Sequence, residues 1–309
     1  MNEKISFVEL SNEWLEVKKF SVKYSTRIKY KNIINVYLKE LFYIEDITEI
    51  DESNCRDYFE KLISNYLLSK SSIKIIRYVL RAILNYGKDV YDIKDINFSY
   101  FKISENKLPI CVLSDEEKDK MVNYCLSNTS YTTVAIYISL YTGMRIGEVC
   151  GLKWEDVDFK NQTISVVRTV QRIKDEDSKN SKTSKMIFEP KTQSSKRVIV
   201  MTNFLAEFLL AYKAESNPKS SKTFIISNSL EIPEPRNVQR NFKKICGLLD
   251  IKATFHILRH TFATNCVKYG MDVKILSELL GHSSITTTMN LYVHPTLDYK
   301  KEQINKIPK

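Results

Sequence analysis

From residue 145 onward, six side chains are of types that suit chemistry at a phosphodiester: Arg145, Lys191, His256, Arg259, His282 and Tyr292. Displacement at such a phosphorus passes through a pentacoordinate state with added negative charge on the non-bridging oxygens. A guanidinium fork matches that geometry better than a point charge does, so two arginines suit two oxygens. Arg145 follows Gly143 at a predicted helix start, where backbone N–H groups also favour an anion, although it could equally pair with Glu148 as an ordinary surface arginine.

The histidines suggest an alternative kind of site, a metal centre. His256 and His260 are four positions apart, which suits two ligands on one helix face. No glutamate follows His256 as in the H-E-x-x-H pattern, no cysteine pair lies nearby, and Arg259 would place a fixed positive charge beside the metal. We therefore expect no metal and a structural role for His260. His256 and Arg259 share a helix face, which would present a proton-handling group beside a phosphate clamp.

Lys191 and Tyr292 are of types that could supply a proton and a nucleophile. Lys191 lies between two predicted strands in EPKTQSSKR, where a lysine could protonate a leaving alkoxide if neighbouring cations lower its pKa, and Lys196 is a rival. A phenol is only about 0.1% ionised at pH 7, so a nucleophilic tyrosine needs cations or a base nearby. The chain has 18 tyrosines, and Tyr292 is distinguished by following His282 across a short predicted helix, SSITTTMNL.

Five segments in order along the chain, TGMRIGE, PKT, HILRH, LGH and MNLYVH, resemble the motifs of the catalytic domain of the tyrosine recombinase (phage integrase) family. The stretch GHSSITTTMNLYVH is most similar to integrases of Gram-positive phages and conjugative transposons. The resemblance implies that Tyr292 attacks the scissile phosphate to give a 3′-phosphotyrosine and a free 5′-hydroxyl. It also implies the remaining roles: Arg145 and Arg259 hold the phosphate, His256 and His282 manage the tyrosine proton, Lys191 rather than Lys196 protonates the leaving oxygen, and Glu148 orients neighbouring groups.

The resemblance further implies a double-stranded DNA partner and a homotetramer on two DNA sites, which exchanges strands through a Holliday junction. Accessory DNA-bending or excisionase proteins are expected partners, and no cofactor is expected, because the energy of the broken bond is kept in the phosphotyrosine. The segment after His294 is expected to pack on a neighbouring protomer. Three alternatives stay open: a Xer-like recombinase that resolves dimers, a monomeric type IB topoisomerase, and a non-catalytic DNA-binding regulator.

Charge also favours a polyanionic partner. The 309-residue chain has 47 Lys and Arg against 37 Asp and Glu. Residues 1–110 hold 18 basic and 16 acidic side chains, whereas the remainder holds 29 and 21, so the basic surplus lies in the second part. With 43% hydrophobic residues, 7 Gly and 7 Pro, the composition excludes disordered and collagen-like chains.

The N-terminal residues and the cysteines predict a cytoplasmic protein. The first residues lack the basic and apolar regions of a signal peptide, and no apolar run approaches the ~20 residues that a membrane helix needs. The cysteines have no C-x-x-C spacing, which favours small apolar side chains in a reducing compartment over a disulfide framework. The six are Cys55, Cys111, Cys125, Cys150, Cys246 and Cys266.

The periodicity predicts a mainly α fold with a small antiparallel β-sheet (α+β). In residues 1–105, helices are expected from Ser25, from Asp51 or Ser53, and from Ser71 or Ser72, the last ending at Gly87. Residues 103–113 are expected to be a linker, and the resemblance makes residues 1–105 a SAM-like core-binding domain.

Residues 106–309 are expected to form the catalytic domain. A capping box of Ser114 and Glu117 opens its first helix, and an apolar helix follows at 132–141. Three β-rich segments (163–170, 185–192 and 196–201) are expected to pair in one sheet, with a solvated loop at 175–185. Helices are expected after Thr202.

Overall fold

In the computed structural model, the chain divides into two units, residues 1–108 with 173–182, and residues 109–172 with 183–309. The described residues are 4–38, 45–65, 68–91, 93–98, 110–174, 183–189, 195–293, 301 and 304–305. Residues 103–109 of the predicted linker at 103–113, and most of the segment after His294, therefore lie outside the described residues. Each unit is described by itself.

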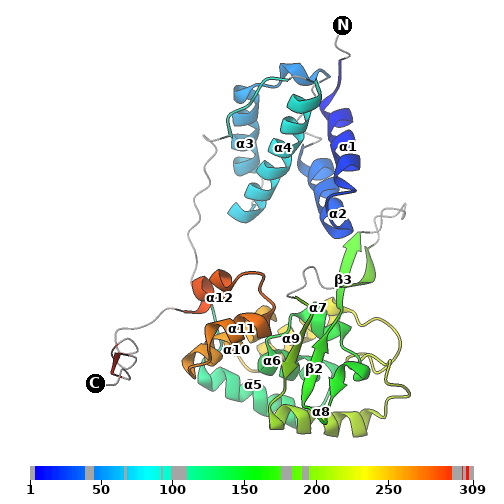
Figure 1. Cartoon of the computed structure of the whole chain (residues 1–309), viewed down its shortest axis with the longest axis vertical. Coiled ribbons are helices and arrows are strands. Elements are labelled where there is room, and N and C mark those ends of the chain that lie inside the picture. The colour runs from blue at the N-terminus through cyan, green and yellow to red at the C-terminus, as the bar shows by residue number, and fades with distance from the viewer. Residues whose placement is uncertain are drawn as a thin grey trace. The chain divides into compact units, whose positions relative to one another are not determined.

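Helices α1 to α4 build the first unit (Figure 1). They are α1 (Phe7–Lys18), α2 (Tyr24–Ile33), α3 (Glu52–Asn65) and α4 (Lys70–Tyr91), with a π-helical turn at Ile34–Leu38 and a 3-10 turn at Ile47–Glu49. A capping box of Ser6 and Glu9 starts α1. The apolar residues of α4 recur at helical spacing and are buried, so this helix lines the core of the unit.

The ends of α4 differ from the sequence expectation. The backbone N–H of Ser72 donates to the Ser69 hydroxyl at 3.2 Å, so the helix starts earlier than predicted. Gly87 does not end it. A Cβ on Gly87 would lie 2.8 Å from Cδ1 of Ile93 and 2.9 Å from Cδ2 of Leu10, so glycine here permits close packing inside the helix. Asp51 caps α3 by accepting from the N–H of Asn54, as one of the two predicted caps.

The second unit surrounds one buried helix. Its helices are α5 (Asp115–Ser127), α6 (Tyr131–Thr142), α7 (Ile146–Gly151), α8 (Asn203–Ser216), α9 (Pro235–Leu248), α10 (His256–Lys268), α11 (Val273–Leu280) and α12 (Ile285–Tyr292). Nearly every side chain of α6 is buried, and α5, α7, α8, α9 and α10 pack against it. The capping box of Ser114 and Glu117 is present, which confirms the predicted start of α5.

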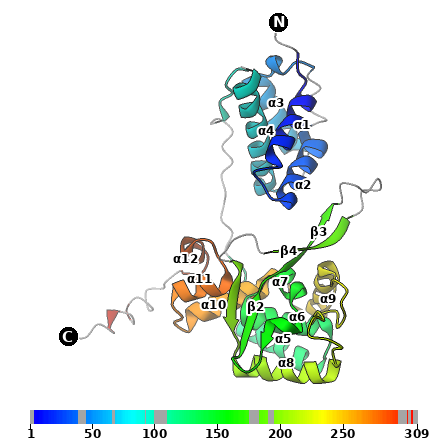
Figure 2. The same ribbon diagram turned by 45° about the vertical axis from the view of Figure 1, so that its right-hand side comes forward.

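The β-structure is divided differently from the prediction. Strands β1 (Val157–Asp158), β2 (Thr163–Val166) and β5 (Arg197–Val200) form an antiparallel sheet in the order β1-β2-β5. Strands β3 (Thr169–Lys174) and β4 (Thr183–Phe188) form a separate two-stranded ribbon that projects from the sheet (Figure 2). The single strand expected at 163–170 was wrong, and so was placing 185–192 in the same sheet.

The break between β2 and β3 has a local cause. The side chain of Arg168 turns inward, where Nη1 bonds the Asp156 carboxylate at 2.5 Å and the Gly151 carbonyl at 3.3 Å. Of the predicted loop at 175–185, residues 175–182 lie outside the described residues, and 183–185 belong to β4. The class expected from the sequence, mainly α with small antiparallel β-structure, is confirmed.

The cysteines mostly behave as apolar side chains. Cys55, Cys125, Cys150 and Cys246 are buried, Cys266 is partly exposed and Cys111 is exposed. Among the helices that the structure describes, none combines the length and apolarity needed to cross a membrane.

Candidate active site

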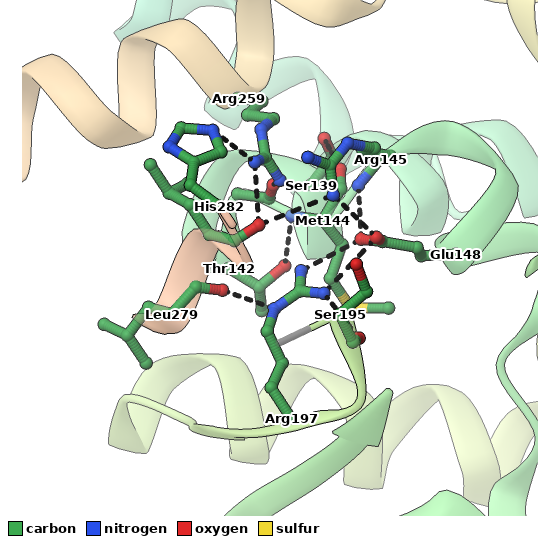
Figure 3. A network of polar contacts seen from close by, with 12 residues as sticks. Ser139, Thr142, Met144, Arg145, Glu148, Ser195, Arg197, Arg259, Leu279 and His282 are labelled. Atoms are coloured by element: carbon green, nitrogen blue, oxygen red, sulfur yellow. Dashed lines mark hydrogen bonds and ion pairs between the residues drawn. The ribbon is translucent and has the colours of Figure 1, made fainter. Parts of the chain in front are cut away.

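A fixed turn between α6 and α7 positions Arg145 (Figure 3). Gly143 ends α6 with φ +66°, and a Cβ there would lie 2.6 Å from Cδ1 of Phe262, so both backbone and packing require glycine. The Ser139 hydroxyl donates to the Met144 carbonyl at 2.9 Å, and the Met144 N–H donates to the Thr142 hydroxyl at 3.2 Å. The turn therefore delivers Arg145 as the N-cap of α7.

Glu148 lies between two arginines. Its carboxylate accepts from Nη1 and the backbone N–H of Arg145, each at 2.9 Å, and from Nη2 of Arg197 at 2.9 Å. Glu148 is 5% exposed. Burial alone would raise its pKa, but hydrogen bonding and charge from Arg197, and charge from Arg145, outweigh this, so the pKa of Glu148 is lowered. Glu148 therefore stays ionised and fixes the base of the Arg145 side chain.

Arg197 is a site residue that the sequence analysis missed. Its guanidinium is buried, donating to Glu148 and, through Nε, to the Leu279 carbonyl at 2.5 Å. A sequence signal did exist. In the strand Arg197–Val200, alternation places Arg197 on the same face as the buried Ile199, whereas Val198 and Val200 are exposed.

Arg259 is the most buried charge of the site. It is 1% exposed and donates to the Gly143 carbonyl at 2.7 Å, to the Leu280 carbonyl at 2.7 Å and to Nε2 of His282 at 3.0 Å. Burial, followed by the charge of Arg145, lowers the pKa of Arg259. Three elements, the end of α6, the end of α11 and the chain after it, are thus held to the first turn of α10.

The bond from Arg259 assigns the protonation of His282. A guanidinium has donors only, so Nε2 of His282 must accept, and Nδ1 then carries the proton and donates to the Thr288 hydroxyl at 2.8 Å. Burial, followed by the charges of Arg259 and Arg145, lowers the pKa of His282 to about 4. His282 is therefore neutral at pH 7, with both ring nitrogens engaged.

The C-terminal end of α11 gathers the three arginines (Figure 3). The last carbonyls of a helix have no partner within it, and the helix dipole makes this end attractive to cations. The Leu279 carbonyl accepts from Arg197, and the Leu280 carbonyl accepts from Arg259 and, at 3.5 Å, from Arg145. Gly281, with φ +65°, then turns the chain so that His282 faces Arg259.

Tyr292 closes the site as the last residue of α12. It is 6% exposed, its hydroxyl lies 2.8 Å from Nδ1 of His260, and its ring is parallel to that of His282 with centroids 6.5 Å apart. Burial raises the pKa of Tyr292, even though the charges of Arg259 and Arg145 act to lower it. The phenol is therefore protonated at neutral pH.

His256 begins α10 beside these groups. His256 is exposed, and its ring meets the ring of His260 edge-on, with centroids 4.6 Å apart. Desolvation of the ring, followed by the charges of His260 and Arg259, lowers the pKa of His256 to about 4. The residues between the two functional positions of this turn, Ile257 and Leu258, are buried as predicted.

Five of the six residues singled out in the sequence meet in this cluster: Arg145, His256, Arg259, His282 and Tyr292. Lys191 lies outside the described residues. His260, which was expected to be structural, contacts the Tyr292 hydroxyl. Within the described ranges, no group of three or more His, Cys, Asp or Glu side chains is arranged to hold a metal ion.

The lowered pKa of His282 predicts a pH dependence of folding. Between about pH 6.5 and 4, the unfolded chain takes up a proton that folded His282 does not, so the stabilisation is complete above pH 6.5 and is lost as pH falls toward 4. In His282→Gln, the amide oxygen can still accept from Arg259. We expect this variant to reduce the fall in the free energy of unfolding over this pH range by up to about 3 kcal/mol. Urea unfolding of the DNA-free protein from pH 7.5 to 4.5 measures this.

A decline of equal slope in both proteins would contradict the neutral assignment of His282. Glu148 affects stability in a different pH range. Because its pKa is lowered on folding, the ionised carboxylate stabilises the folded protein above the unfolded value of 4.5, and this stabilisation is lost only below that pH.

The sequence and the fold are similar to those of known proteins. Residues 112–298 match the phage integrase family, and residues 6–63 match the N-terminal SAM-like domain of phage integrases. The tyrosine recombinase XerC-like protein of Caldanaerobacter subterraneus subsp. tengcongensis is 29% identical over 315 residues, covering 94% of this chain and 79% of that protein.

Two solved structures share the fold. One is the Tn1549 transposon integrase in complex with a circular intermediate DNA, with a TM-score of 0.79 and 23% identity over 98% of this chain and 100% of that one. The other is a lambda integrase tetramer bound to a Holliday junction, with a TM-score of 0.68 and 18% identity over 95% and 80% of the two chains. The region that matches the phage integrase family spans more than half of the sequence and includes every described residue of the cluster. The chain therefore belongs to the phage integrase family and is a tyrosine-type site-specific recombinase that cuts and rejoins DNA.

Proposed function

We propose that Tyr292 is the nucleophile of strand cleavage and that Arg145 and Arg259 hold the scissile phosphate. The observation that carries this proposal is the convergence of both guanidinium groups and the Tyr292 phenol at the end of α11. Attack by the phenol oxygen forms a 3′-phosphotyrosine and releases the 5′-oxygen. Lys191 protonates that oxygen, a role supported by its motif alone.

The remaining side chains position these groups. Glu148, held by Arg197, orients Arg145, and His282 orients Arg259 through Nε2. The preorganised positive charge stabilises the pentacoordinate state most, because that state carries the most negative charge. The bond energy is retained in the phosphotyrosine, so rejoining needs no nucleotide.

At the level of the assembly, we infer that double-stranded DNA is the substrate, that residues 1–105 form a core-binding domain and that residues 106–309 form a catalytic domain. The basic surplus after residue 110 supports DNA binding. Four copies on two DNA sites would exchange strands through a Holliday junction, as the lambda integrase tetramer on such a junction suggests. Accessory DNA-bending or excisionase proteins and a cytoplasmic location complete the proposal.

Integration of a mobile element is the favoured biological reaction, supported by the likeness to an integrase bound to a circular transposon intermediate. A dimer-resolving recombinase is the second candidate, supported by the XerC-like relative. Joining of a circular substrate to a linear target in the presence of both site types distinguishes integration from resolution of a two-site plasmid.

A nicked suicide substrate tests the chemistry. Cleavage beside the nick releases a short fragment, so the covalent complex accumulates. We expect proteolysis and mass spectrometry to place the DNA on Tyr292, and the released strand to carry a 5′-hydroxyl that a kinase can label. Attachment at another residue, or a 5′-linked protein, would overturn the proposal.

Cleavage is expected to be independent of metal ions. Two arginines and a lysine supply at the phosphate the positive charge that a metal would otherwise bring. The adduct should therefore form at an unchanged rate in excess EDTA. Loss of cleavage that added zinc or magnesium restores would revive the metal interpretation of His256 and His260.

A further inference from the structure

We propose that His260 accepts, at Nδ1, the proton that Tyr292 loses when it attacks the phosphate. The inference rests on Tyr292 being the nucleophile. It assigns the general base to a partly buried histidine of α10, one position beyond Arg259, rather than to His256 or His282.

The geometry selects His260 among the histidines around the phenol. Its Nδ1 lies 2.8 Å from the Tyr292 oxygen, within the range for direct proton transfer. In His282, Nε2 accepts from Arg259 and Nδ1 donates to Thr288, and its ring lies parallel to the phenol at 6.5 Å rather than pointing a nitrogen at it. The ring of His256 meets the ring of His260.

His260 is also in the protonation state that a base requires. Desolvation, followed by the charge of Arg259, lowers its pKa, so the ring is neutral at pH 7 and one nitrogen has a free lone pair. The Tyr292 phenol is protonated, because burial raises its pKa. The hydroxyl then donates to Nδ1 of His260, and Nε2 carries the ring proton.

The proton and bond changes balance within the site. As the Tyr292 oxygen bonds to phosphorus and the P–O5′ bond breaks, the phenol proton moves to Nδ1 and His260 becomes an imidazolium. The leaving 5′-oxygen takes its proton separately, from Lys191 in the proposed mechanism. In rejoining, the 5′-oxygen attacks, and the imidazolium returns its proton to the departing phenol oxygen.

Two variants of His260 separate a base from a positioning group. His260→Asn keeps a hydrogen-bonding atom at the place of Nδ1 but cannot take up a proton, and His260→Ala removes both properties. We expect both to slow single-turnover cleavage by about 10²–10⁴-fold while site-specific DNA binding and the urea midpoint stay close to those of the wild type. Recovery by His260→Asn to within tenfold of the wild-type rate would overturn the base and leave His260 a holder of the phenol.

A substrate with sulfur in place of the bridging 5′-oxygen shows whether His260 acts on the nucleophile or on the leaving group. A thiolate leaves without protonation, so Lys191→Ala should recover on the sulfur substrate, whereas both His260 variants should remain slow. If sulfur rescues the His260 variants, His260 acts on the leaving group and the proposal fails. Failure of Tyr292 as the nucleophile is detected separately, because Tyr292→Phe would then still form the adduct.

Discussion

A protein carrying Tyr292→Phe is expected to bind its DNA site with unchanged affinity and to form no covalent complex with a nicked suicide substrate. The change removes one oxygen. The ring, which is 6% exposed, keeps its packing, and the lost oxygen gives up its hydrogen bonds with His260 and Arg259. The folding cost is therefore about 1 kcal/mol. Denaturing gels after incubation with labelled DNA measure the adduct directly.

Tyr269→Phe is the matched control. It removes the same atom from a phenol outside the cluster, because Tyr269 is 76% exposed. This protein should form the adduct at the wild-type rate. A covalent complex formed by Tyr292→Phe would falsify the assignment of the nucleophile.

Lysine in place of either phosphate-holding arginine is expected to separate cleavage from binding. Arg145→Lys and Arg259→Lys keep the charge but lose the fork that spans two oxygens. Cleavage should fall by about 10²–10³-fold or more for each, while affinity for the site changes by less than about 1 kcal/mol, since only one of many phosphate contacts is altered. Single-turnover cleavage and binding isotherms at several salt concentrations provide the two readouts.

The two variants should differ in stability. Arg145 is 40% exposed in its side chain, whereas Arg259 is 1% exposed and donates to the carbonyls of Gly143 and Leu280. The single ammonium nitrogen of lysine cannot occupy the positions of both Nη1 and Nη2, so we expect Arg259→Lys alone to lower the free energy of unfolding by about 1–3 kcal/mol. If Arg259→Lys lost binding in proportion to cleavage, Arg259 would be an ordinary backbone contact.

Most of the cluster could be located from the sequence because the family resemblance and local spacing indicate the same residues. Gly143 next to Met144 and Arg145 indicates a helix end followed by a cation, and the spacing of His256 and Arg259 places both on one turn of α10. The role of Lys191 stays a prediction.

Contacts between distant segments were beyond the reach of these patterns. His260 looked structural because its partner, Tyr292, arrives from a helix whose orientation no local spacing encodes. For Arg197, strand alternation indicates an inward side chain, but it does not show that the partner is Glu148 of α7. At Gly87, the rule that glycine ends helices gave way to close packing against α1.

At the end of α11, part of the site is built from backbone atoms rather than from side chains. The acceptors for Arg145, Arg197 and Arg259 there are the carbonyls of Leu279 and Leu280, which every amino acid possesses. A mutational scan would therefore score these two leucines by their packing and would not detect the polar contacts. Inserting or deleting one residue within α11 would instead rotate its terminal carbonyls by about 100° relative to the start of the helix. The length of this helix, more than the identity of its last residues, encodes how the three guanidinium groups are held.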